Sequence, residues 1–266
     1  MTGKEDKTRP NLPHNDARYL ISSCRLGIEA RQALREMDIE ISDSPILGSV
    51  DSRLAHHTDL GICHISQGVI AVCPGIYDKI DIEGIRIIKG MKDPGATYPL
   101  DASYNVCVLG KYAIHNFDHT DEILIDHLKK EYELLHVRQA YSKCLVSPVT
   151  ENFVITQDKG IAKVLEKNNV EVLLIEEKKI LLEGYPWGFI GGASFMANKD
   201  TWVINGSLGR LDSCYDIEEG LRKFGISYRC LTEKQPVDTG SFLILYEENT
   251  WQDKIYSKYR VEGAQA

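Results

Sequence analysis

One cysteine of this chain stands in surroundings that suit a nucleophile. Cys144 follows Lys143 at the head of a predicted strand, in the segment 142–148. Exposure at that point and the neighbouring cation would lower the pKa of the thiol, which is what makes a cysteine reactive. The other six cysteines lie mostly among apolar residues of predicted strands, where free cysteine usually serves as a small buried hydrophobe. They are Cys24, Cys63, Cys73, Cys107, Cys214 and Cys230.

A histidine and a carboxylate two residues apart form the second candidate group, His57 and Asp59. In an extended segment, alternation would place both side chains on the same face, where they could point into one cavity. A polar turn before a strand is the alternative interpretation. A metal site built from His56, His57, Asp59 and His64 is a further one, although alternation places His56 and His64 opposite His57.

A third polar cluster, residues 118–122, predicts a helix start rather than a site. Asp118 or Thr120 can cap the free N–H groups of the helix that follows. Asp121 and Glu122 would then lie in its first turn, where the helix dipole favours negative charge.

These segments belong to a repeated pattern. Five similar strand heads lie about 40 to 50 residues apart, a period typical of repeat arrays and propellers. They occupy residues 57–61, 101–105, 141–144, 191–194 and 238–241. Second strands follow the first four heads at 68–72, 112–115, 153–156 and 202–205, and they are rich in β-branched and aromatic residues.

Helices and third strands complete most units. Helices are predicted at about 120–131, 158–168 and 214–224, and third strands at 134–137, 172–175 and 226–230. The first unit has no clear helix. The fifth unit is divided between a strand at 242–245 and an N-terminal strand, helix and strand at 19–23, 28–37 and 39–41. If these two parts meet, they close the ring and leave no unpaired edge.

Length and composition limit the class of protein. The 266 residues suit one domain over 17–266, preceded by a flexible polar arm at 1–16. The formal net charge of −8 disfavours nucleic acid as a partner and weakly favours a small cationic ligand. Without a long apolar run, a signal peptide or paired cysteine spacing, the chain is expected to avoid membranes and to be cytoplasmic with reduced thiols.

Together these features resemble the pentein superfamily of guanidine-modifying enzymes, which includes arginine deiminase, dimethylarginine dimethylaminohydrolase and agmatine deiminase. The resemblance implies an α/β fold, a five-bladed α/β-propeller of ββαβ units around a pseudo-five-fold axis that carries the active site. In that superfamily a His, often in an H-x-D motif, lies two units before the Cys nucleophile. His57 and Cys144 keep this separation, in the first and third complete units.

The resemblance spans about residues 19–245 if the chain is circularly permuted relative to the deiminases. Their Cys strand head has the pattern Gly-Gly-x-x-Cys-Leu/Met-Ser-x-Pro, and the segment 142–148 is similar, with Pro148 displaced by one. Their first carboxylate motif, of the type Phe-Val-Glu-Asp-Thr-Ala, falls on residues 189–194, where Gly191 and Gly192 replace the acids. Asp238 keeps the acid of the following unit. The chain looks most similar to a bacterial branch that shares Gly-Phe-Ile-Gly-Gly-Ala-Ser and Lys-Cys strings.

The resemblance implies a cysteine-dependent hydrolase or amidinotransferase that acts on a small guanidine-like cation and needs neither metal nor organic cofactor. Cys144 would attack the guanidinium carbon, Asp59 and Asp238 would accept its N–H groups, and His57 would transfer protons. Gly191 and Gly192 would let the backbone approach the ligand. The loops at 92–99 and 182–188 would contact the rest of it. A non-catalytic pentein that binds a ligand or a protein, and a metal-dependent enzyme of another fold, are the alternatives.

Overall fold

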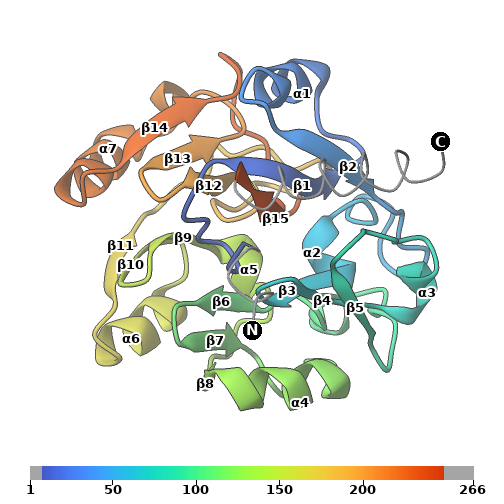
Figure 1. Ribbon diagram of the computed structural model, residues 1–266. Coiled ribbons are helices and arrows are strands. Elements are labelled where there is room, and N and C mark those ends of the chain that lie inside the picture. The colour runs from blue at the N-terminus through green and yellow to red at the C-terminus, as the bar shows by residue number, and fades with distance from the viewer. Residues whose placement is uncertain (1–7, 249–266) are drawn as a thin grey trace.

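Five small sheets form a ring around a central axis (Figure 1). The computed structural model describes residues 8–248. Each sheet has three strands, and the strand orders are β3-β4-β5, β6-β7-β8, β9-β10-β11, β12-β13-β14 and β15-β1-β2. The predicted five-bladed α/β-propeller is therefore confirmed.

Four units are continuous in sequence and share one topology, in which the first strand pairs antiparallel with the second and the second pairs parallel with the third. A parallel pair needs a crossover connection, and a helix supplies it. The units are β3 Ile62–Ser66, β4 Val69–Val72, α3 Pro74–Tyr77 and β5 Arg86–Lys89; β6 Cys107–Leu109, β7 Tyr112–His115, α4 Glu122–Glu131 and β8 Glu133–His136; β9 Val146–Thr150, β10 Phe153–Thr156, α6 Lys159–Lys167 and β11 Glu171–Leu174; and β12 Ser194–Asn198, β13 Thr201–Ile204, η2 Leu208–Arg210, α7 Cys214–Lys223 and β14 Ser227–Cys230.

The fifth unit joins the two ends of the described chain. Strand β15, Leu243–Glu247, pairs antiparallel with β1, Ala17–Ser23, so that Leu20 lies opposite Ile244. Strand β1 then pairs parallel with β2, Glu40–Ser44, across helix α1, Ile28–Arg35. This unit repeats the topology of the other four, which confirms the predicted closure of the ring.

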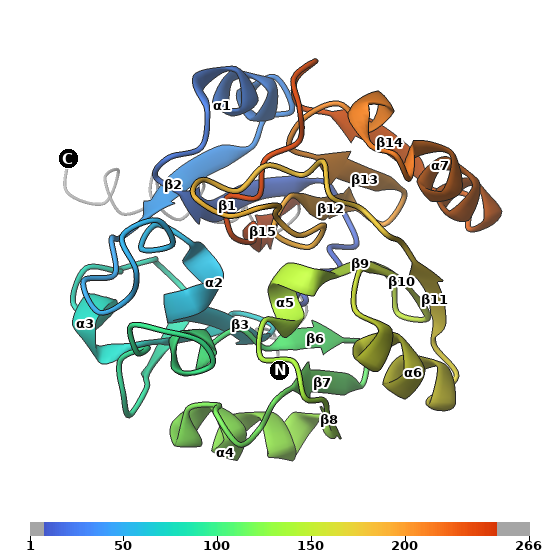
Figure 2. The same cartoon turned by 180° about the vertical axis from the view of Figure 1, so that it is seen from behind.

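Burial separates inner strands from outer ones. All residues of β15 and of β6 are buried, and β3, β9 and β12 each expose only their last residue in part. The third strands β5 and β11 show the opposite pattern, with both end residues exposed and none fully buried. The first strand of each unit therefore faces the axis (Figure 2), and the sequence meets this requirement with nearly continuous apolar runs.

The alternation argument assumed that the heads of the inner strands are extended, but several of them are short turns. Residues 58–61 form a single helical turn, α2 Thr58–Gly61, before β3, and α5 Ser142–Leu145 does the same before β9. A 3-10 turn, η1 Leu100–Ala102, precedes β6. The turn before β9 is stabilised from the neighbouring unit, because the Lys143 and Cys144 N–H groups that it frees donate to Asn105.

The described part of the predicted N-terminal arm lies against the ring. The Asn11 amide donates to the Val108 carbonyl at 2.8 Å, and the His14 and Asn15 N–H groups donate to the Glu247 carboxylate at 2.7 and 2.6 Å. Residues 1–7 and 249–266, which complete the predicted arm and domain, lie outside the described residues, and the domain limits stay a prediction. Within 8–248 no helix is long and apolar enough to cross a membrane.

A buried aspartate, Asp121, joins three parts of the second unit. It caps α4, because one carboxylate oxygen accepts the Ile123 and Leu124 N–H groups at 3.0 and 3.2 Å. The second oxygen accepts the Met91 and Lys92 N–H groups and the Tyr104 hydroxyl. The cluster 118–122 is therefore structural, as predicted, but the cap is Asp121 rather than Asp118 or Thr120.

Replacement of Asp121 by Ala should lower the free energy of unfolding by on the order of 3 kcal/mol, since a helix cap and three further buried hydrogen bonds are lost together. Urea denaturation measures the change. Asp126→Ala on the exposed face of the same helix, which removes only an i,i+3 ion pair with Lys129, should cost less than about 0.5 kcal/mol. Equal losses in the two variants would contradict this role.

Candidate active site

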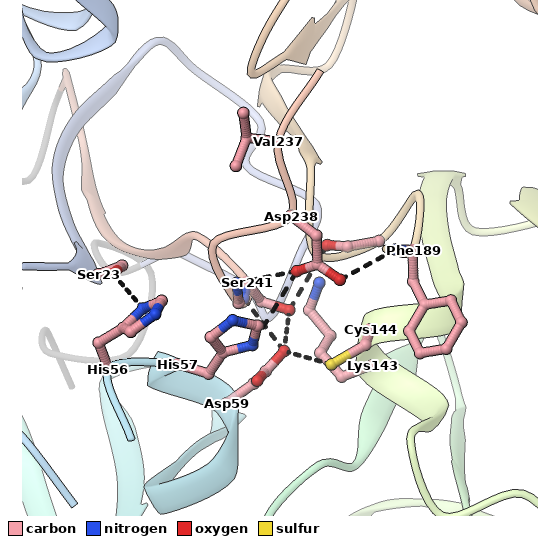
Figure 3. Close-up of polar contacts among 12 residues, drawn as sticks. Ser23, His56, His57, Asp59, Lys143, Cys144, Phe189, Val237, Asp238 and Ser241 are labelled. Carbon is pink, nitrogen blue, oxygen red and sulfur yellow. Dashed lines mark hydrogen bonds and ion pairs between the residues drawn. The ribbon is translucent and has the colours of Figure 1, made fainter. Parts of the chain in front are cut away.

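The thiol of Cys144 lies within a buried polar cluster at one end of the axis (Figure 3). Its Sγ donates to Asp59 Oδ2 at 3.1 Å and accepts from Asn105 Nδ2 at 3.1 Å. Asn105 Oδ1 accepts the N–H groups of Lys143 and Cys144 at 2.8 and 3.2 Å. Three units of the ring thus meet at this sulfur, and Asn105 fixes the turn that carries it.

Asp59 connects the thiol to the closing unit of the ring. Its Oδ2 accepts from the Ser241 N–H at 3.0 Å and from the Ser241 hydroxyl at 2.5 Å, in addition to Cys144. Its Oδ1 is buried and has no hydrogen-bond partner within residues 8–248. A buried carboxylate oxygen without a donor carries a substantial desolvation penalty, so Oδ1 is an unsatisfied acceptor of this cluster.

His57 and Asp238 complete the cluster. His57 Nδ1 lies 4.0 Å from Asp238 Oδ1, while the buried His57 Nε2 has no partner among the described residues. Asp238 is held by backbone groups, because Oδ2 accepts the Phe189 N–H and Oδ1 accepts the Gly240 N–H, both at 2.9 Å. The structure therefore brings Cys144, His57, Asp59 and Asp238 together, as the sequence predicted.

Burial and charge keep the thiol protonated, contrary to expectation. The pKa of Cys144 is raised well above its usual range, first by burial and then by the charges of Asp59 and Asp238. The exposure that we expected is missing, since only 4% of the residue is accessible. Burial also raises the pKa of Asp238 to about 7 and lowers that of His57 to about 4. At neutral pH the site therefore holds a thiol and a neutral imidazole.

Lys143 brings a positive charge to the interior but does not activate the thiol. The side chain is 4% exposed, and its ammonium makes no hydrogen bond or ion pair with any residue from 8 to 248. Its charge partly offsets the effect of burial on the pKa of Asp238 and on those of Cys63 and Cys107. The positive charge of Lys143 therefore partly compensates the negative charge of the carboxylates near the axis.

The two glycines that stand in place of acids are required by close packing. A Cβ atom on Gly191 would lie 2.7 Å from the Cys144 carbonyl oxygen, and one on Gly192 would lie 2.5 Å from Asp238 Cγ. The Gly192 N–H already donates to the Cys144 carbonyl at 3.0 Å. The backbone at these positions thus approaches the turn of Cys144 and the Asp238 side chain, and neither glycine lines the cavity described next.

A cavity of about 230 Å³ opens above the cluster. His57, Cys144 and Asp238 form its buried floor, and its walls come largely from the loop between β11 and β12. The predicted recognition loop at 182–188 therefore lies at the cavity. The other predicted loop, 92–99, lies behind it, where Tyr98 packs against Tyr141 with ring centroids 5.1 Å apart. The wall residues are Leu54, Leu60, Tyr141, Leu182, Tyr185, Pro186, Trp187 and Phe189.

The residues of the alternative metal site do not converge. His56 turns away from His57 and shares a 2.8 Å hydrogen bond with Ser23 (Figure 3). His64 is buried in β3, and both its ring nitrogens lack a partner among residues 8–248. In that same part of the chain no group of three or more His, Cys, Asp or Glu side chains is arranged to hold a metal ion.

Three of the remaining six cysteines are buried, as expected of structural residues. Burial raises the pKa of Cys63, Cys73 and Cys107 to about 12. Cys24, Cys214 and Cys230 are half-buried.

Sequence reasoning missed Asn105, Ser241 and half of the wall. A signal was present for the first two, because each lies two residues before an inner strand, as Cys144 does. Both belong to the predicted strand heads, and the sequence assigns them no further role. The predicted recognition loop at 182–188 supplies half of the wall residues, whereas Leu54, Leu60, Tyr141 and Phe189 lie outside it.

The architecture is similar to that of solved structures of two amidinotransferases. The inosamine-phosphate amidinotransferase of Streptomyces griseus is 12% identical, with a TM-score of 0.57 over 92% of this chain and 97% of that chain. An amidinotransferase of Microseira wollei from the saxitoxin biosynthetic pathway is 9% identical, with a TM-score of 0.52 over 85% and 91%. Similarity at this level of identity is similarity of fold, and the fold is that of the penteins.

The family follows from the sequence itself. A family of unknown function (DUF6873) matches residues 21–243, and the chain belongs to it. A search of the curated proteins finds no match. The circular permutation relative to the deiminases stays a prediction.

Gly192→Ala should destabilise the protein by on the order of 1–3 kcal/mol, because the new methyl group must displace an Asp238 carboxylate held by two backbone N–H groups. Urea denaturation measures the loss. Gly209→Ala is the matched control, since the nearest atom to its Cβ is 3.9 Å away. If both substitutions were neutral, the packing argument would be wrong.

Stability should fall as the pH is lowered from 7 to 5. Burial lowers the pKa of His56, His57, His64 and His115 to about 4, so below pH 6.5 the unfolded chain binds protons that the folded chain excludes. Asp238, with a raised pKa, acts in the opposite sense between about pH 4 and 7, but it is one group against four. We expect a loss of several kcal/mol by urea denaturation.

A variant isolates the contribution of one histidine. His64→Gln should reduce the slope of unfolding free energy against pH by up to about 1.4 kcal/mol per pH unit between pH 4 and 6.5. An unchanged slope would show that His64 titrates normally in the fold.

Proposed function

We propose that the protein is a Cys144-dependent enzyme that cleaves a C–N bond of a small guanidine-like cation, as a hydrolase or an amidinotransferase. The observation that carries this proposal is the convergence of a thiol, an imidazole and a carboxylate from three units on one buried cavity floor, with a second carboxylate, Asp59, hydrogen-bonded to the thiol. The fold shared with two amidinotransferases supports it, because a pentein ring can hold such chemistry at its axis.

The charges of the site favour a cationic ligand. Burial is the first cause of the raised pKa of Cys144, and the charges of Asp59 and Asp238 raise it further. A bound guanidinium adds a positive charge beside the sulfur and reverses that effect. The free Asp59 Oδ1 accepts one N–H of the planar group, as carboxylates do with guanidinium ions. The substrate therefore activates its own nucleophile.

The reaction runs in two balanced steps. The Cys144 sulfur forms a bond to the central carbon of the guanidinium, the C–N bond to the leaving amine breaks, and the thiol proton leaves on that amine through His57. Water then adds to the thiouronium carbon, gives a proton to His57, and displaces the sulfur, which regains its proton. In an amidinotransferase a second amine replaces the water.

A non-catalytic ligand-binding protein is the second candidate, and Gly191 and Gly192 are the observation that favours it. They stand where the deiminases carry an acid pair, so a guanidinium ligand would have fewer carboxylates to bind. A site that binds a guanidinium but does not turn it over would still protect Cys144 from modification.

Labelling with 2-chloroacetamidine, an electrophile that mimics a guanidinium, tests the proposal. At pH 7 Cys144 should react at least about tenfold faster with it than with neutral iodoacetamide, because only the cation offsets the charges of the two acids. Peptide mass spectrometry locates the modified residue. His57→Ala and Asp59→Ala should abolish the difference, while His136→Ala, at a half-exposed site on β8, should preserve it.

Equal rates with the two reagents, or labelling spread over several cysteines, would remove the support for a guanidinium site. Release of ammonia or of an amine from a guanidine by the wild-type protein, absent in Cys144→Ser, separates the enzyme from the binding protein.

A further inference from the structure

The walls of the cavity, rather than its floor, indicate which guanidine fits. Above His57, Cys144 and Asp238 the lining is made of aliphatic and aromatic side chains, together with one proline. We propose that the substrate carries an apolar group, best an aromatic ring, on its guanidine nitrogen and has no carboxylate. This inference rests on the proposed function and specifies its substrate class.

No cation lines the cavity within the described residues. The Tyr141 hydroxyl, which is on the wall, is already bound to Asp101 at 2.5 Å. The other polar groups of the wall, the Tyr185 hydroxyl and the Trp187 indole N–H, are neutral. A substrate carboxylate in this position would lose its hydration without gaining an ion pair, which is strongly unfavourable. Free arginine therefore fits the floor but not the walls.

Two cations contact the wall from outside the lining, and Lys143, next to Cys144, does not line the cavity either. Arg53 lies over the Tyr185 ring, 4.6 Å from its centroid, and its guanidinium binds the Asp51 carboxylate and the Gly184 carbonyl. Lys178 lies over the Trp187 ring at 5.1 Å. Both cations contact aromatic residues of the wall without belonging to its lining. They support the rings and leave the space in front of them apolar.

The wall is fixed to the floor by the backbone. The Asp238 N–H donates to the Leu181 carbonyl at 2.8 Å, and the Leu181 N–H donates to the Pro236 carbonyl at 2.8 Å. Across the loop, the Gly188 N–H donates to the Ile180 carbonyl at 2.7 Å. The segment that bears the aromatic rings is therefore tied to the segment that bears Asp238, so the spacing between ring and carboxylate is set before any ligand arrives.

The size of the cavity limits the apolar group. Its volume of about 230 Å³ lies below the ~300–1,000 Å³ typical of drug-sized ligands. The space suits a guanidinium with one ring or a short alkyl chain. Aromatic walls also attract the face and edge of a further ring, and they attract the guanidinium itself through cation–π contacts.

Protection of Cys144 against iodoacetamide compares substrates without requiring turnover. Benzylguanidine should protect at a concentration at least about 100-fold lower than arginine, and it should be converted with a correspondingly higher kcat/KM. Arginine protecting as well as or better than benzylguanidine would overturn the inference. If 2-chloroacetamidine labels Cys144 selectively but benzylguanidine does not protect it, this inference is wrong and the proposed function stands. If 2-chloroacetamidine does not label Cys144 selectively, both the proposed function and this inference are wrong.

A pair of adjacent leucines supplies the matched variants. Leu182 is half-buried on the wall, whereas Leu181 is 52% exposed and does not line the cavity. Leu182→Arg introduces a cation that can pair with a substrate carboxylate, so it should narrow the preference for benzylguanidine over arginine by at least about tenfold. Leu181→Arg should leave the preference unchanged. Equal effects of the two substitutions would show that the wall does not select the substrate.

Discussion

The antiparallel pairing of β15 with β1 is the contact on which the site depends. It joins segments more than 200 positions apart and gives the last sheet the same strand order as the other four. Ser241 and Asp238 lie directly before β15, so this pairing places the Ser241 hydroxyl on Asp59 and the Asp238 carboxylate beside His57. An open ring would hold the thiol and its histidine but neither of these partners.

Closure also explains why the site can be dry and polar at once. The inner strands begin together at one end of the axis, and the N–H groups of their heads need acceptors. Asn105 accepts N–H groups of the helical turn that carries Cys144, while Asp59 and Asp238 accept those of Ser241 and Gly240. Asp59 and Asp238 also disfavour ionisation of Cys144, so the carboxylates that hold the backbone in place help to keep the thiol protonated.

Much of the fold was predictable, because period, strand composition and helix amphipathicity are local properties. The second, third and fourth units and the two halves of the fifth were recognised within a few residues, whereas the short helix α3 and the strand β5 of the first unit were not predicted. Cys144, His57, Asp59 and Asp238 followed from strand heads and from the resemblance to penteins. The protonated state of the Cys144 thiol did not follow from the sequence. Lys143 is its neighbour along the chain, but the side chains that control its pKa come from other units. The aromatic wall was predicted in part, through the loop 182–188, but the contact between Phe189 and Tyr141 forms only after folding.

The distribution of the site over the chain has a consequence for synthesis on the ribosome. Cys144 emerges well before Asp238 and Ser241, so the nucleophile waits through the translation of nearly one hundred further residues without its full set of partners. During that interval only Asp59 can lie beside the sulfur, because Asp238 has not yet been made. On the proposed function, a guanidinium would therefore meet both carboxylates only after the last strand pairs with β1.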